Sequence, residues 1–121
     1  VRFTGNLDND ALVACYSKAL VFVFPSLYEG FGFPPLEAMA CQTPVVAFDV
    51  ATMPEVVGDG GILVSRGDGA AFFRAVDRLV SDPVLRHQWG KRGKERARIF
   101  QWDQTVREHV DVYQKVLKES G

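Results

Sequence analysis

Residues 29–37 read Glu-Gly-Phe-Gly-Phe-Pro-Pro-Leu-Glu, and this segment restricts the local fold more than any other part of the chain. An apolar run at 19–24 precedes it, and a helix-favouring stretch begins at Pro35. The two glycines and two prolines preclude a continuous helix between Glu29 and Glu37. The sequence therefore predicts a strand, then a sharp loop, then a helix with proline in its first turn.

Short apolar runs alternate with helix-period segments through the first two-thirds of the chain. The runs are β-branched or aromatic and end at Gly, Pro or Ser, which is typical of buried strands. Alternating strands and helices predict an α/β fold with a parallel sheet covered on both faces. The last third has helical periodicity only. The predicted strands are 1–4, 19–24, 44–48 and 61–64, and the predicted helices are Asp8–Lys18, Pro35–Cys41, 69–80, 83–100 and 102–117.

The size and composition are those of one globular unit: 121 residues, 47% hydrophobic and 24% charged. No apolar run approaches the roughly 20 residues that span a bilayer. Because the chain opens on Val1, inside an apparent strand, we expect it to be part of a longer protein. Cys15 and Cys41 have no metal-site or disulfide spacing, which favours small buried side chains in a reducing cytoplasm.

The charge is unevenly distributed. Residues 1–64 carry two basic and seven acidic side chains, whereas residues 65–121 carry twelve basic and eight acidic ones. A basic stretch at 86–98 is compatible with the solvated face of a helix, or with a positively charged patch that binds nucleic acid or the anionic lipids of a membrane. We expect no nucleic-acid partner.

The acidic pair predicts a ligand crevice. Ligands of open α/β sheets bind outside the carboxyl ends of the strands, and both Glu29 and Glu37 would border that edge. Gly30 and Gly32 would let a ligand approach the main chain, and the N–H groups of 31–33 could hold phosphate oxygens. Carboxylates beside such a site would bind sugar hydroxyls. The alternatives are that Glu37 stabilises its own helix N-terminus, in the first turn, and that Glu29 is an exposed loop acid.

The segment Glu29–Ala40, followed by Thr43-Pro44-Val45-Val46-Ala47, closely resembles the signature of the family 4 retaining glycosyltransferases of GT-B fold. The resemblance extends to Phe24-Pro25-Ser26, to 53–59 and to 61–64. It implies a Rossmann-like parallel sheet with flanking helices. The chain would then be an incomplete C-terminal GT-B domain of about four strands, followed by C-terminal helices, with 1–121 forming a single partial domain.

The resemblance also implies roles for individual residues. Glu37 would bind the ribose of a nucleotide-sugar donor, and Glu29, the catalytic-site acid, would contact the donor sugar. The backbone from Gly30 through Phe31 and Gly32 to Phe33 would contact the sugar and the diphosphate. Leu7 would pack against the nucleobase. The donor is a substrate, and the resemblance implies neither a cofactor nor a metal; the Asp8-Asn9-Asp10 pattern is interpreted as a helix cap rather than a metal site.

Some features depart from the family or are missing. Gln42 occupies a position that is usually glycine, which predicts either a different helix ending or a left-handed residue costing roughly 1–2 kcal/mol. The phosphate-binding cations and the N-terminal domain of the family lie outside these residues, so the chain alone is expected to be inactive.

The strand order 3-2-1-4-5-6 would leave the edge of 20–24 open, to be covered by the first strand or by a second chain. Other interpretations are a GT-B-fold nucleotide-sugar epimerase and a non-catalytic donor-binding or docking module.

Overall fold

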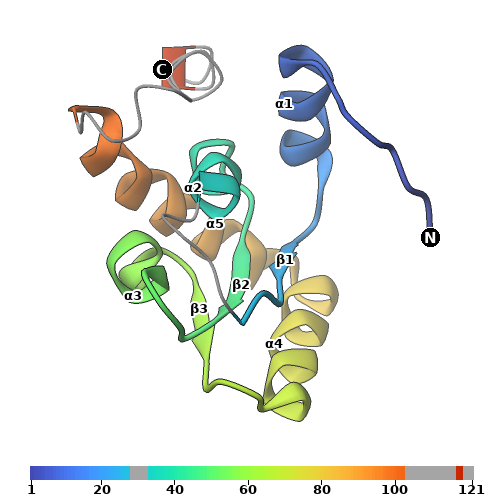
Figure 1. The fold of residues 1–121 in the computed structure, drawn as a ribbon, viewed down its shortest axis with the longest axis vertical. Helices are drawn as coiled ribbons and strands as arrows, with labels where there is room; N and C mark the ends of the chain where they lie inside the picture. The colour runs from blue at the N-terminus through green and yellow to red at the C-terminus, as the bar shows by residue number, and fades with distance from the viewer. Residues whose placement is uncertain (28–32, 103–116, 119–121) are drawn as a thin grey trace.

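The computed structural model describes residues 1–27, 33–102 and 117–118. Its centre is a three-stranded parallel sheet in the order β1-β2-β3, with β1 Phe22–Phe24, β2 Val45–Phe48 and β3 Ile62–Val64 (Figure 1). The helices are α1 Asn9–Lys18, α2 Phe33–Ala40, α3 Met53–Val56, α4 Gly69–Ser81 and α5 Pro83–Arg98, with short 3-10 turns η1 Gly58–Gly60 and η2 Ile99–Trp102. The predicted Rossmann-like class, a parallel sheet with flanking helices, is confirmed.

Strand β2 forms the middle of the core. All four of its residues are buried, and α2, α4 and α5 contact it. A β-branched apolar run that is buried on both faces is the pattern expected of a central parallel strand. The other fully buried side chains come mainly from α2 and α3: Leu36, Met39, Met53 and Val56.

The prediction of a strand at 1–4 is wrong, and the sheet has three strands rather than about four among the described residues. Residues 1–6 are exposed, and the side chain of Phe3 is 94% accessible. A β-branched and aromatic run becomes a strand only where a neighbouring strand can pair with it. The expectation that this segment would cover the edge of 20–24 fails for the same reason, because β1 pairs with β2 alone in the described chain.

Helix boundaries agree with the sequence signals. The Asp8 side chain accepts a hydrogen bond from the Ala11 N–H at 2.8 Å, so the capping interpretation is confirmed. Asp68 and Asp82 cap α4 and α5 in the same way. Of the helix predicted over 102–117, all but the ends lie outside the described residues. No helix in the described ranges is both long and apolar enough to cross a bilayer.

Helix α5 crosses the core at very close range because two of its residues are glycines. A Cβ on Gly90 would lie 2.4 Å from the Gln42 carbonyl oxygen, and one on Gly93 would lie 3.0 Å from the Gly60 oxygen. The same glycines weaken an isolated helix by about 1 kcal/mol each relative to alanine. Their place in α5 is therefore explained by packing against α2 and η1.

Candidate functional site

The carboxyl ends of the three parallel strands lie side by side, and the last strand residues there are Phe24, Phe48 and Val64. The loop after β2 contains a strained residue, since Ala51 has φ of 49°. A non-glycine residue in the left-handed region costs about 1–3 kcal/mol, and such strain gathers at ligand-binding edges. Alanine carries no sequence signal for this conformation, so sequence reasoning missed it.

Among the predicted site residues that the structure describes, Glu37 is buried and hydrogen-bonded. It lies in the middle of α2, is only 7% exposed, and accepts a hydrogen bond from the Tyr16 hydroxyl at 3.1 Å. Because α2 begins at Phe33, Glu37 stands in the second turn, and the predicted first-turn position is wrong. A carboxylate that far from the helix start gains little from the helix dipole, so the helix N-terminus does not explain its burial. A buried carboxylate needs hydrogen-bond donors, and Tyr16 is one of them.

Tyr16 is itself held firmly. Its ring packs edge-on against Phe22 at 5.5 Å between centroids, and its carbonyl oxygen accepts a hydrogen bond from the Thr43 hydroxyl. Burial, together with the adjacent Glu37 carboxylate, raises the pKa of the Tyr16 phenol above its ordinary value. The phenol therefore stays protonated and donating at neutral pH. Tyr16 thus connects α1 to α2, to β1 and to the segment between α2 and β2.

Periodicity placed Tyr16 on the buried face of its helix but did not pair it with Glu37. The available signal was chemical. A tyrosine on an apolar face needs a partner for its hydroxyl, and a carboxylate on the next helix is a natural acceptor.

The other predicted site residues are only partly described. Leu7 is half-buried directly before the Asp8 cap of α1. Phe33 is the first residue of α2, and its side chain lies outside the described part. Glu29, Gly30, Phe31 and Gly32 lie outside the described residues. The structure thus provides contacts for Glu37 and a location for Leu7, and the other predicted site residues lie wholly or partly outside the part of the chain that it describes.

The end of α2 settles the question raised by Gln42. Its φ is 64°, so it is left-handed, and the helix ends in a Schellman motif. The Thr43 N–H donates to the Ala38 carbonyl at 3.0 Å, and the Gln42 N–H donates to the Met39 carbonyl at 2.9 Å. The helix therefore ends as it would with glycine, and glutamine bears the conformational cost.

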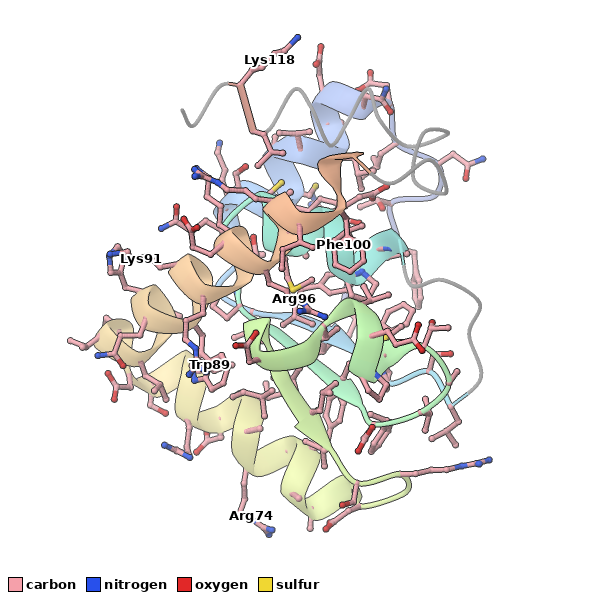
Figure 2. All side chains as sticks on the ribbon, turned by 90° about the vertical axis from the view of Figure 1, so that its left-hand side faces the viewer. Arg74, Trp89, Lys91, Arg96, Phe100 and Lys118 are labelled. Atoms are coloured by element: carbon pink, nitrogen blue, oxygen red, sulfur yellow. The ribbon has the colours of Figure 1, made fainter. Side chains whose placement is uncertain are left out.

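Much of the basic stretch at 86–98 is used inside the fold. Arg86 donates to the Leu79 and Val80 carbonyls at the end of α4. Arg96 donates to the carbonyls of Glu55 and Val56 at the end of α3. Figure 2 shows Arg96 reaching from α5 toward that turn, near Phe100, whose ring centroid is 5.6 Å away. Lys94 is buried, which a solvated helix face would not require.

Comparisons with known proteins place this fold in a family. The family model described as Glycosyl transferases group 1 matches residues 1–96. The chain belongs to the group 1 glycosyltransferases. It is 36% identical over 113 residues to an O-antigen chain mannosyltransferase B from Escherichia coli, covering 93% of this chain and 30% of that protein. It is 44% identical over 109 residues to an alpha-maltose-1-phosphate synthase from Mycobacterium tuberculosis, covering 83% of this chain and 28% of that protein.

A solved structure agrees with the sequence relatives. Sucrose-phosphate synthase from Thermosynechococcus elongatus superposes with a TM-score of 0.77 at 35% identity, over 98% of this chain and 31% of that one. The predicted family and GT-B fold are confirmed. The chain spans less than a third of the length of these three proteins.

Proposed function

We propose that this chain is the donor-binding part of a retaining glycosyltransferase that moves a sugar from a nucleotide diphosphate sugar to an acceptor. The observation that carries the proposal is the buried Glu37 carboxylate on α2, the helix that follows Gly30 and Gly32 in the sequence. The hydroxyl of Tyr16, on α1, donates a hydrogen bond to this carboxylate and orients it. The side chain of such a carboxylate is already ordered before the ligand binds. Hydrogen bonds from vicinal hydroxyls to it therefore form with little further loss of side-chain entropy. The ribose of the donor supplies such hydroxyls.

The remaining roles follow the family resemblance. Glu29 contacts the donor sugar, and the main-chain N–H groups of Gly30, Phe31, Gly32 and Phe33 face the sugar and the diphosphate. Leu7 lies against the nucleobase. The leaving diphosphate is stabilised by these dipoles and by cations supplied from outside these residues, without a metal. On this proposal the chain alone binds donor weakly and does not turn it over.

The test is calorimetric titration with UDP-, GDP- and ADP-sugars. Glu37→Ala should weaken the binding that the unmodified protein shows by roughly 10- to 100-fold, which corresponds to hydrogen bonds to a charged group worth about 1.5–3 kcal/mol. Glu55→Ala removes an exposed glutamate from α3 and is the matched control, which should leave binding unchanged. Equal binding by the unmodified protein and Glu37→Ala would refute the assigned role.

The acceptor is a sugar, a lipid-linked sugar or another hydroxyl compound, handled in the cytoplasm, in part on the inner face of the membrane. Peripheral membrane association is best tested at Lys91 and Arg92. Both are exposed, whereas Lys94 and Arg96 belong to the interior of the fold. Vesicle binding that persists after charge reversal at both positions would remove this part of the proposal.

Self-association is proposed at the outer edge of β1. That edge lacks a partner strand in the described chain, and Leu20 and Val23 beside it are 51% and 45% exposed. An apolar open edge favours pairing with a second copy. A Val23→Lys variant should then sediment as a monomer under conditions in which the unmodified chain forms dimers.

A further inference from the structure

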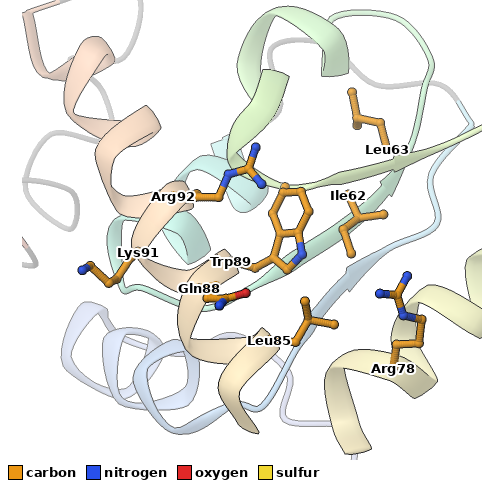
Figure 3. A pocket seen from close by; sticks show the side chains of 9 residues that line it. Ile62, Leu63, Arg78, Leu85, Gln88, Trp89, Lys91 and Arg92 are labelled. Atoms are coloured by element: carbon orange, nitrogen blue, oxygen red, sulfur yellow. The ribbon is translucent and has the colours of Figure 1, made fainter. Parts of the chain in front are cut away.

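A hollow of about 800 Å³ lies beside β3, at the opposite edge of the sheet from β1. Its base is the backbone segment Gly61–Leu63, and α4 and α5 form its walls. Figure 3 shows its side chains, among them Trp89, Ile62, Leu85, Arg78 and Arg92. Neither Glu37 nor Leu7, the two proposed donor-site residues whose side chains the structure describes, lines it.

The main chain of β3 has groups that face this hollow. The Asp49 N–H donates to the Val64 carbonyl at 2.7 Å, so the peptide groups of Val64 face β2. Successive residues of a strand direct their N–H and C=O groups to opposite edges, so those of Leu63 face the open edge. Gly61 has the same parity and an extended backbone, with φ of −148° and ψ of 179°. Gly61 is buried, however, so Leu63 is the main-chain position in the hollow that is accessible for pairing with another strand.

The side chains around this edge are apolar in the middle and cationic at the sides. Trp89 and Leu85 are half-buried, and Ile62 lies beside them. In Figure 3 the guanidinium groups of Arg78 and Arg92 stand on either side of this apolar group. The Arg92 guanidinium is stacked 4.3 Å from the centroid of the Trp89 ring, which limits the conformations of both side chains before any ligand arrives.

The two arginines have no carboxylate partner in the part of the chain that the structure describes, where the salt bridge found joins Arg98 to Glu95. Lys91 adds a third cation at the rim. No acidic side chain of the described residues lines this hollow, whereas Asp59 and Glu95 line a neighbouring hollow that Lys91 and Arg92 also border. The complement of the hollow beside β3 is a partner with acidic groups on both sides of an apolar one.

We propose that the outer edge of β3 binds an extended acidic peptide segment of a partner protein, which adds to the sheet as a strand. Its main chain pairs with Leu63. An apolar side chain rests on Trp89, and acidic side chains two positions before and after it meet Arg78 and Arg92. Alternate residues of a strand point to one face, so an acid-x-apolar-x-acid pattern brings all three groups to the surface together. A lone phosphate or a lipid headgroup would leave the main-chain groups unused.

The probe is the capped peptide Thr-Glu-Thr-Val-Thr-Glu-Thr, titrated against the full chain and followed by calorimetry and by the NMR signal of the Trp89 indole N–H. We expect saturable binding that weakens about tenfold in Arg78→Glu and in Arg92→Glu, and that falls with salt. Arg78→Gln removes the charge without reversing it, so it should weaken peptide binding less than Arg78→Glu does. Arg74→Glu, at an exposed α4 position outside the hollow, is the control and should bind as the unmodified chain does (Figure 2).

Strand addition has a signature of its own. Two N-methylated peptides, one methylated on the Glu and Val residues and the other on the Thr residues, should bind with different affinities. Only one of these two sets of N–H groups faces β3 in the proposed complex. Equal effects of the two methylation patterns would overturn the proposal. So would equal binding of a peptide with Lys in place of Glu, or binding of inorganic phosphate or phosphatidylglycerol vesicles without binding of the peptide. Donor titration of Arg78→Glu should be unchanged, so this test fails or succeeds independently of the donor site.

Discussion

Replacing Tyr16 with phenylalanine should destabilise the protein by removing a single hydroxyl. The ring and its 5.5 Å contact with Phe22 are retained in Tyr16→Phe, whereas the hydrogen bond to Glu37 is lost. A hydrogen bond to a charged group contributes about 1.5–3 kcal/mol, and the carboxylate left behind is buried. We therefore expect the free energy of unfolding to fall by about 2 kcal/mol, a large share of the roughly 5–15 kcal/mol typical of a domain.

The same contact predicts a pH dependence. Because the pKa of Tyr16 is raised in the folded state, the unfolded chain loses this proton first, at about pH 10. Above that pH the folded state holds one more proton than the unfolded state, so stability falls as the pH rises, by up to about 1.4 kcal/mol per pH unit. Below pH 10 the contribution is fully present. Tyr16→Phe lacks this component and should lose stability less steeply.

The assay is equilibrium urea unfolding of both proteins from pH 7 to pH 11. A double-mutant cycle with Glu37→Gln isolates the pair, since a direct contact should make the two losses non-additive. Parallel pH profiles, together with a difference below about 0.5 kcal/mol at pH 7, would refute the reasoning.

Three further substitutions test the packing around α2 and α5 by thermal or urea unfolding. Gln42→Gly should stabilise the protein by about 1 kcal/mol, because glycine adopts the left-handed φ of 64° without strain, and a loss of stability would contradict the Schellman assignment. Gly90→Ala should destabilise it by about 1–3 kcal/mol despite better helix propensity, since the new Cβ meets the Gln42 oxygen; a more stable variant would show that the helices are not in close contact. Arg96→Met should cost about 1–3 kcal/mol, because it leaves the Val56 carbonyl without its donor, and an unchanged midpoint would rule out that capping role.

The alternation of apolar runs and helical segments was sufficient to predict the sheet. Each of the last three predicted strands contains an observed one, and the motif helix begins within two residues of its predicted start. These features are local, set by side-chain periodicity and by proline and glycine. The Asp8 cap was predictable for the same reason, since its acceptor and donor are three residues apart.

The failures arise where distant residues decide the outcome. Residues 1–4 have the composition of a strand, but no strand of the described residues pairs with them. Gly90 and Gly93 are unfavourable in an isolated helix, and only the close packing of α5 against the end of α2 and against η1 explains them. The sequence pattern places Arg96 on a solvated helix face, whereas its side chain donates hydrogen bonds to carbonyls at the end of α3. The Tyr16–Glu37 hydrogen bond joins residues 21 positions apart. A single sequence has no signal for such contacts beyond the general need of buried polar groups for partners.

The most direct measurement of the central proposal is the energetic coupling between Glu37 and the ribose hydroxyls of the donor. The nucleotide sugar that binds best is compared calorimetrically with its 2′,3′-dideoxyribose analogue, on the unmodified protein and on Glu37→Ala. Loss of the hydroxyls should weaken binding to the unmodified protein by about 1.5–3 kcal/mol, or roughly 10- to 100-fold, and should not weaken binding to the variant. Equal weakening in the two proteins would contradict the assignment of Glu37 as the ribose-binding group.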